Sequence, residues 1–204
     1  HDLQQPIDAL LVYAQLLDET PGLAAELAPR LARAADALKS VLASVLEFAL
    51  LKSDTAAVAP RPIDVGGLFK DLQAVYEPLA RQKGLTLRLK PTDATIVGEP
   101  AVWHRIVGNL LANAIGHTVR GGVLLAARRR SGAISLEVWD TGIGIAPQDQ
   151  QRVFEPFVRL GHPQATGGSG LGLAIVAELS ARLGCQVSLR SRLGRGSVFR
   201  VLTG

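Results

Sequence analysis

The chain has 204 residues, which suffices for one ordinary domain and a smaller element. Its 48% hydrophobic and 20% charged residues are typical of a globular protein and exclude a disordered chain. The net charge of +4 is mild, and the densest basic run, at 128–130, lacks the interleaved aromatic residues of a nucleic-acid surface. No apolar run reaches the roughly 18 residues that span a bilayer, and because the chain starts at His1 rather than Met, we expect any membrane anchor to lie upstream.

Residues 1–57 are predicted to form a helical hairpin. Apolar side chains recur alternately four and three residues apart from Leu3 to Leu17 and again from Leu27 to Phe48, which is the heptad pattern of packed helices. A Thr-Pro-Gly sequence at 20–22 separates the two helices. A lone hairpin leaves its apolar seam half exposed, so the pattern predicts a homodimer that completes a four-helix bundle.

A linker is predicted at 58–62 and a second domain at 63–204. Helices are expected over 65–82, 102–117 and 171–183. Strands are expected over 85–89, 123–128, 134–140, 187–190 and 197–202. Because helices and strands mix without regular alternation, we expect an α+β domain in which helices cover one face of a mixed sheet.

Two polar features of this domain are suited to binding a nucleotide. Asn109 and Asn113 stand one helical turn apart, so their amides are either solvent-facing groups or oxygen ligands for a cation such as Mg²⁺, with phosphates completing its shell. Asp140 continues the apolar face of its strand, where a carboxylate needs a hydrogen-bond donor. Seen alone, an Asp-Gly-containing strand end is more often a plain turn.

Glycines supply the third feature. Gly168, Gly170 and Gly172 precede a helix whose free N–H groups would face an anion, although a flexible loop is the alternative. Gly142 and Gly144 allow the backbone to approach closely beside the aspartate. A Gly-Arg-Gly sequence at 194–196 is compatible with a hairpin turn.

The order of the motifs carries a resemblance. Asn-Leu-Leu-Ala-Asn-Ala at 109–114, Asp-Thr-Gly-Ile-Gly at 140–144, Phe-Glu-Pro-Phe at 154–157 and Gly-Ser-Gly-Leu-Gly-Leu at 168–173 follow one another as in the ATP-binding domain of sensor histidine kinases. The opening His-Asp-Leu-Gln-Gln-Pro at 1–6 resembles the phosphoacceptor box of that family. The resemblance implies a Bergerat-type α/β sandwich of the kind shared with gyrase and heat-shock ATPases, behind a dimerisation hairpin.

The resemblance also implies roles for individual residues. It implies that His1 accepts the γ-phosphate of ATP while Asp2 orients its ring, that Asn113 binds Mg²⁺ with Asn109 as a possible second ligand, and that Asp140 accepts from the adenine amine. Further nucleotide contacts are implied at His117, Gly142, Gly144, Arg159, Gly168, Gly170, Leu171, Gly172 and Gly196. The phosphoryl group would pass to an aspartate of a response-regulator receiver domain in the cytoplasm. The segment between 144 and 170 resembles the ATP lid, with Phe154 and Phe157 expected to anchor it to the core or to the helical bundle.

The chain departs from the family pattern at two positions in these motifs. Gly116 stands where relatives usually carry Lys or Arg, so Arg120 or Arg159 is expected to supply the cation. Gln5 precedes the proline where Thr or Asn is usual, which makes it the candidate residue for phosphatase activity. Two alternatives stay open: a degenerate kinase that serves as a dimeric scaffold, and an ATPase or serine kinase on the same fold.

Overall fold

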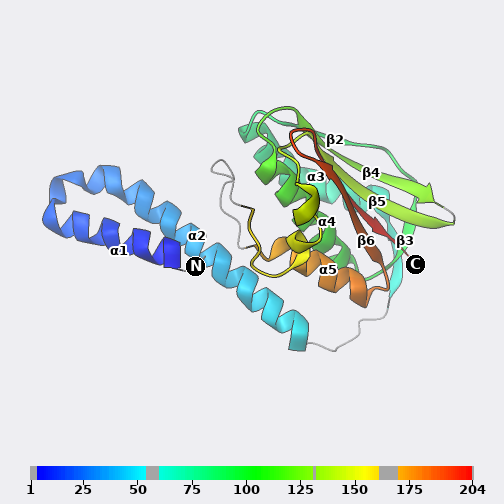
Figure 1. Ribbon diagram of the computed structural model, residues 1–204, viewed down its shortest axis with the longest axis horizontal. Coiled ribbons are helices and arrows are strands. Elements are labelled where there is room, and N and C mark those ends of the chain that lie inside the picture. Colours follow the sequence, from blue (N-terminus) through cyan, green and yellow to red (C-terminus); the bar gives the residue numbers. More distant parts are fainter. Residues whose placement is uncertain (1–3, 54–59, 131, 161–169, 204) are drawn as a thin grey trace. The chain divides into compact units, whose positions relative to one another are not determined.

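The computed structural model describes residues 4–53, 60–130, 132–160 and 170–203. They belong to two compact units (Figure 1): residues 1–54 with 167–171, and residues 55–166 with 172–204. No helix among the described residues is long and apolar enough to cross a membrane.

The first unit is the predicted hairpin. Helix α1 (Gln4–Glu19) and helix α2 (Ala24–Ser53) pack together across the short 3-10 turn η1 (Pro21–Leu23). Leu27 and Ala34 of α2 are buried, but other apolar side chains of the two helices remain 38–61% exposed, among them Leu11, Leu16, Leu42 and Leu46. The hairpin therefore exposes much of its apolar surface, as expected of half a bundle.

The second unit contains a five-stranded mixed sheet. Its strands are β2 (Thr86–Leu89), β4 (Gly122–Arg130), β5 (Ala133–Asp140), β6 (Gln186–Arg192) and β7 (Gly196–Leu202), in the order β2-β4-β5-β7-β6. The β2–β4 pair is parallel and the other pairs are antiparallel. All five strands agree with the sequence-based expectation. The separate antiparallel pair β1 (Arg61–Asp64) and β3 (Thr95–Gly98) was not predicted. Its first strand begins within the predicted linker at 58–62, where Pro60 and Pro62 argue against a strand.

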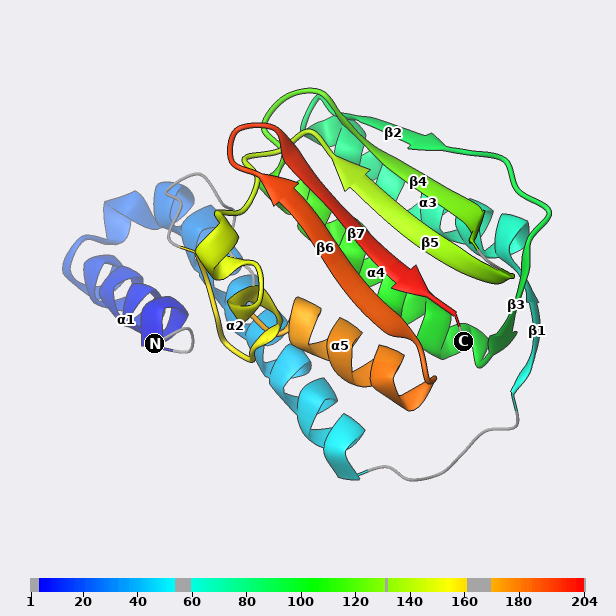
Figure 2. The same cartoon turned by 45° about the vertical axis from the view of Figure 1, so that its right-hand side comes forward.

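Three helices cover one face of this sheet: α3 (Val65–Gln82), α4 (Pro100–His117) and α5 (Gly172–Arg182), as Figure 2 shows. The first of them starts where the Asp64 carboxylate accepts the N–H groups of Gly66 and Gly67, at 3.0 and 2.9 Å. Apolar side chains of the helices and of alternate strand residues form the core. Its fully buried members include Phe69, Trp103, Ile106, Leu110, Leu125, Leu136 and Val201.

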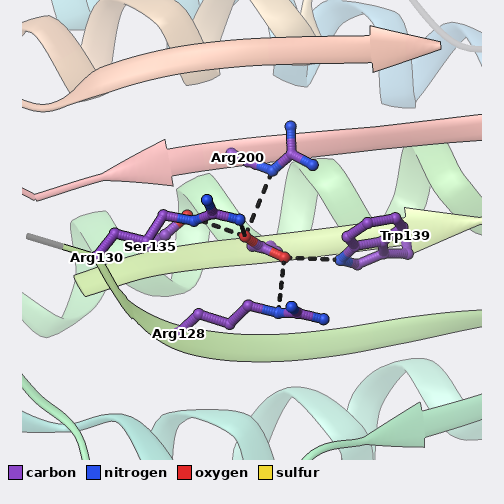
Figure 3. Close-up of polar contacts among 6 residues, drawn as sticks. Arg128, Arg130, Ser135, Trp139 and Arg200 are labelled. Carbon is purple, nitrogen blue, oxygen red and sulfur yellow. Dashed lines mark hydrogen bonds and ion pairs between the residues drawn. The ribbon is translucent and has the colours of Figure 1, made fainter.

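The opposite face of the sheet is polar and centres on Glu137 of β5. This carboxylate is fully buried although it lies on the face that no described helix of this unit covers. It pairs with Arg130 at 3.0 Å, Arg128 at 3.2 Å and Arg200 at 3.4 Å, and it accepts the indole N–H of Trp139 at 2.9 Å. Figure 3 shows the three guanidinium groups and the indole around the carboxylate. Burial raises the pKa of Glu137, but the hydrogen bonds and the arginine charges outweigh it, so the pKa is lowered overall.

We predict that Glu137→Gln destabilises the protein by about 3 kcal/mol at pH 7, because three guanidinium groups would lose their counter-charge. Since the pKa of Glu137 is lowered, its stabilisation is present above the ordinary glutamate pKa and is lost as the pH falls through the lowered value. The difference between wild type and variant should therefore narrow in acid. Urea unfolding at several pH values measures it.

The control is Glu99→Gln, whose side chain makes no capping bond to α4. It should change stability by less than about 0.5 kcal/mol. Equal stability of wild type and Glu137→Gln at pH 7 would contradict a stabilising role for the arginine cluster.

Candidate functional site

Asp140 lies at the end of β5, with its side chain toward the helix-covered side of the sheet. Its Oδ1 atom accepts the backbone N–H of Gly142 at 2.8 Å and that of Ser197 at 3.2 Å. Burial raises the pKa of Asp140, and these hydrogen bonds only partly offset it, so the pKa is raised overall. The ionised carboxylate therefore has donors on one side but no cation to balance its charge among its described partners.

Close backbone approach fixes the loop that follows Asp140. A β-carbon on Gly142 would collide with the carbonyl oxygen of His117, the last residue of α4, and one on Gly196 would collide with the carbonyl oxygen of Asp140. The N–H of Ile143 donates to the same His117 carbonyl at 3.2 Å. The two glycines are thus required for packing, and they hold the aspartate loop between α4 and the β6–β7 turn. For Gly142 this agrees with the sequence-based interpretation.

The two asparagines lie on α4, which leads into this loop. The Asn109 amide donates to the Arg105 carbonyl at 3.0 Å, so its nitrogen is occupied and its oxygen is directed elsewhere. A β-carbon on Gly172, the first residue of α5, would lie 3.2 Å from that oxygen. The half-buried side chain of Asn113 makes no hydrogen bond with any described residue. Four segments distant in sequence therefore adjoin one another: the asparagines of α4, the loop after Asp140, the start of α5 and the start of β7.

This donor set fits a nucleotide-bound Mg²⁺ better than a cation held by protein alone. No group of three or more His, Cys, Asp or Glu side chains suited to a metal occurs among the described residues. Asn113 offers an unpartnered amide oxygen one helical turn from Asn109, and Mg²⁺ commonly takes few protein ligands together with phosphate oxygens. The start of α5 adds backbone N–H groups suited to an anion beside Asn109.

A lysine that the sequence analysis did not consider lies at the end of α4. Lys83 caps α3, and its Nζ donates to the carbonyls of Ile115 at 3.1 Å and Gly116 at 3.0 Å. Around Gly116 itself, no heavy atom lies within 4 Å of the position that a β-carbon would occupy. A positive charge is thus present at residue 116 although that residue has no side chain. The charge comes from Lys83, which is 33 positions from Gly116 in the chain, so no local sequence pattern reveals it.

The remaining predicted residues are placed as follows. The side chains of His117, Arg120 and Arg159 are exposed. Gly144 and Gly170 have positive φ angles, and Leu171 is fully buried directly before α5. His1, Asp2 and Gly168 lie outside the described residues. Gln5 is within α1, and its side chain also lies outside what the structure describes.

The segment after Asp140 is tied to the sheet by side chains that carried no sequence signal. The N–H of Ile145 donates to the Ser191 hydroxyl at 2.7 Å, and the Gln150 amide donates to the carbonyls of Ile145 and Ser191. Phe154 meets Phe199 of β7 edge-on, with ring centroids 6.2 Å apart, as an anchor should.

Phe157 does not anchor the segment to the core. Its side chain is 56% exposed, and its backbone adopts a φ of 63°, which is rare outside glycine. Phe154 thus anchors the segment to the core, whereas Phe157 does not. The other expected anchor point for Phe157, the helical bundle of the first unit, stays a prediction.

Comparison with known proteins identifies this arrangement. The family model described as histidine kinase-, DNA gyrase B- and HSP90-like ATPase matches residues 98–203, slightly more than half of the chain and every motif from α4 onward. The chain belongs to this ATPase family. The sensor-like histidine kinase SenX3 of Mycobacterium tuberculosis is 32% identical over 207 residues, which cover 98% of this chain and 50% of SenX3.

Solved structures agree. The chain is similar to full-length ShkA in complex with AMPPNP, with a TM-score of 0.75 and 32% identity over 100% of this chain and 44% of ShkA. The histidine kinase AdeS of Acinetobacter baumannii is similar with a TM-score of 0.80 and 20% identity, and the match covers 100% of this chain and 97% of the AdeS chain. This likeness shows the shared fold. The mixed-sheet unit of this ATPase is thus a sensor histidine kinase catalytic domain, as the motif order predicted. The chain spans about half the length of SenX3.

We predict that Asp140→Asn makes this ATPase domain more stable at pH 7, by about 1 kcal/mol, because asparagine keeps the acceptor for Gly142 but removes an uncompensated charge. An acid whose pKa is raised by folding destabilises the fold while ionised, and this penalty disappears as the pH falls through the raised pKa. The advantage of the variant should therefore shrink in acid, as followed by thermal unfolding between pH 3 and pH 8.

Asp93→Asn is the matched control, because its side chain is 97% exposed. It should leave stability nearly unchanged. A less stable Asp140→Asn protein at pH 7 would show that the carboxylate stabilises the apo fold and would contradict the assignment of an uncompensated charge.

Proposed function

We propose that this chain is the core of a sensor histidine kinase that binds Mg·ATP in the second unit and phosphorylates His1. The observation that supports this most directly is the convergence of Asp140, α4 and the start of α5 through the contacts of Gly142, Gly172 and Gly196. A fold of this family without that convergence would carry no argument for activity.

The nucleotide would be read from both ends. The Asp140 carboxylate, when ionised, accepts from the exocyclic amine of adenine, which supplies the donor that its environment lacks. Asn113, with Asn109 as a possible second ligand, holds Mg²⁺ on the phosphates, where the ion offsets charge that develops during phosphoryl transfer. Backbone groups of 168–172 and the side chains of His117 and Arg159 are the further proposed contacts. Gly144, Gly196 and Leu171 would line the proposed nucleotide site.

The first unit would supply the phosphoryl acceptor and the surface that contacts partner proteins. A neutral His1 ring attacks phosphorus through one nitrogen, and Asp2 holds the proton on the other. The exposed apolar residues of α1 and α2 would be covered by a second copy in a homodimer. The phosphoryl group then passes to a response-regulator aspartate in the cytoplasm. Gln5 is the candidate for orienting the water that later hydrolyses this aspartyl phosphate. A membrane anchor would lie in a segment outside this chain.

We predict that Asn113→Ala weakens Mg·ATP binding at least about tenfold and abolishes labelling from γ-labelled ATP, because both depend on the bound cation. His1→Gln should abolish labelling while leaving nucleotide affinity within about twofold, since the acceptor lies outside the nucleotide site. Isothermal titration and labelling of the full-length protein measure the two effects.

The chemistry of the label separates the alternatives. A phosphohistidine is stable in alkali and labile in acid, whereas the phosphoserine of a serine kinase shows the opposite behaviour. Labelling that persists in His1→Gln would refute the acceptor assignment. A protein that neither binds nucleotide nor becomes labelled would be the dimeric scaffold, the alternative that Gly116 favours.

A further inference from the structure

The face of the sheet that no described helix of its unit covers is strongly basic. Side chains alternate along each strand, so the residues opposite to the core positions all point to this face. Its charged members are six arginines and one glutamate: Arg88, Arg128, Arg130, Arg190, Arg192, Arg200 and Glu137. Figure 2 shows this face of the sheet in front of α3 and α4.

This face holds the whole positive excess of the chain. Six arginines and one glutamate give it a formal charge of +5, whereas the chain as a whole, with 22 basic and 18 acidic residues, has a charge of +4. The remaining 16 basic and 17 acidic residues are therefore nearly balanced. A local concentration of one sign on an otherwise neutral molecule attracts partners of the opposite sign to that surface.

The arginines are arranged around an apolar centre. One row across the sheet runs from Arg88 through Leu124, Trp139 and Val198 to Arg190, each paired with the next in register. Neither terminal arginine makes a hydrogen bond or ion pair with a described residue. Four inter-strand steps of roughly 4.8 Å separate them, about 19 Å, which an extended peptide of six or seven residues spans.

Glu137 makes part of this surface rigid before any partner arrives. It holds the guanidinium groups of Arg128, Arg130 and Arg200, two of which also lie over the Trp139 ring, at 5.8 and 5.4 Å from its centroid. Ordered arginines lose less entropy on binding than free ones, and their planar forks match carboxylates in a bidentate manner.

We infer that this face, defined by its six arginines, docks an acidic segment of a protein partner that places its carboxylates on the guanidinium groups. The use of arginine alone, whose planar groups pair with carboxylates in a bidentate manner, favours a carboxylate-rich peptide. A single-stranded nucleic acid needs free aromatic faces for stacking, and guanidinium groups already lie over Trp139. No large apolar side chain of this face is among the strongly exposed ones that would insert into a membrane.

The test uses the full chain and a dye-labelled peptide of the sequence Glu-Asp-Glu-Leu-Glu-Asp-Glu, followed by fluorescence anisotropy at low and at physiological salt. Wild type should bind, more weakly at the higher salt. The double variant Arg88→Glu/Arg190→Glu should bind at least about tenfold more weakly at low salt, because two attractions become repulsions. The milder double variant Arg88→Gln/Arg190→Gln should weaken binding about threefold. It replaces the charge-reversed variant as the test if Arg88→Glu/Arg190→Glu does not fold.

The matched control reverses two charges elsewhere. Arg33 of α2 and Lys70 of α3 are exposed and lie outside this face, so Arg33→Glu/Lys70→Glu changes the net charge equally and should weaken binding less than about twofold. Equal weakening by both double variants would reduce the effect to net charge and overturn the proposal. Absence of peptide binding, or binding of phosphatidylserine vesicles or a DNA oligomer in its place, would also overturn it.

Discussion

The side-chain alternation of β5 is the constraint on which both faces of this protein depend. As the central strand of the sheet, β5 sends Ile134, Leu136 and Val138 into the core and Glu137 to the uncovered face, and it ends at Asp140. A shift of register by one residue would bury Glu137 among apolar side chains and remove Asp140 from the site. The register of β5 with β4 and β7 therefore determines the positions, and with them the roles, of Glu137 and Asp140.

Two carboxylates on this strand, three residues apart, illustrate how surroundings assign roles. Both are withdrawn from water, which by itself raises the pKa of each. Glu137 has three arginines and an indole N–H, so its pKa is lowered and it serves as a structural counter-ion. Asp140 has only backbone and hydroxyl donors, so its pKa is raised and it retains an unmet need for a donor. That difference favours Asp140 as the ligand-reading group.

Much of this organisation could be predicted from sequence because the relevant patterns are local. The heptad spacing of α1 and α2, the alternation of β4 to β7 and the motif order from Asn109 to Gly172 lie in short windows, and each agrees with the structure. The pair β1–β3 was not predicted, because Pro60 and Pro62 made the start of β1 resemble a linker and its pairing with β3 is formed only in the fold.

What could not be predicted comes from residues that meet only in the fold. Lys83 reaches the end of α4 from α3, and Arg200 reaches Glu137 from a strand far along the chain. Neither neighbourhood has a signature in sequence, because a long basic side chain reads as solvent-exposed wherever it stands. The motif at 154–157 led us to expect anchoring to the core or to the bundle, and the sequence did not show that only Phe154 packs in the core while Phe157 is exposed.

These findings bear on whether Gly116 marks a degenerate site. The substitution removes one cationic side chain, yet Lys83 places an ammonium group on the carbonyl of that same residue. Asp140 remains a partly buried carboxylate with a raised pKa, an arrangement that lowers the stability of the apo fold and that asparagine would relieve. Asn113 likewise leaves an amide without a partner in the described structure. A scaffold needs neither feature, whereas a nucleotide site needs both, so the physical chemistry of the site supports the proposed nucleotide binding over the degenerate alternative.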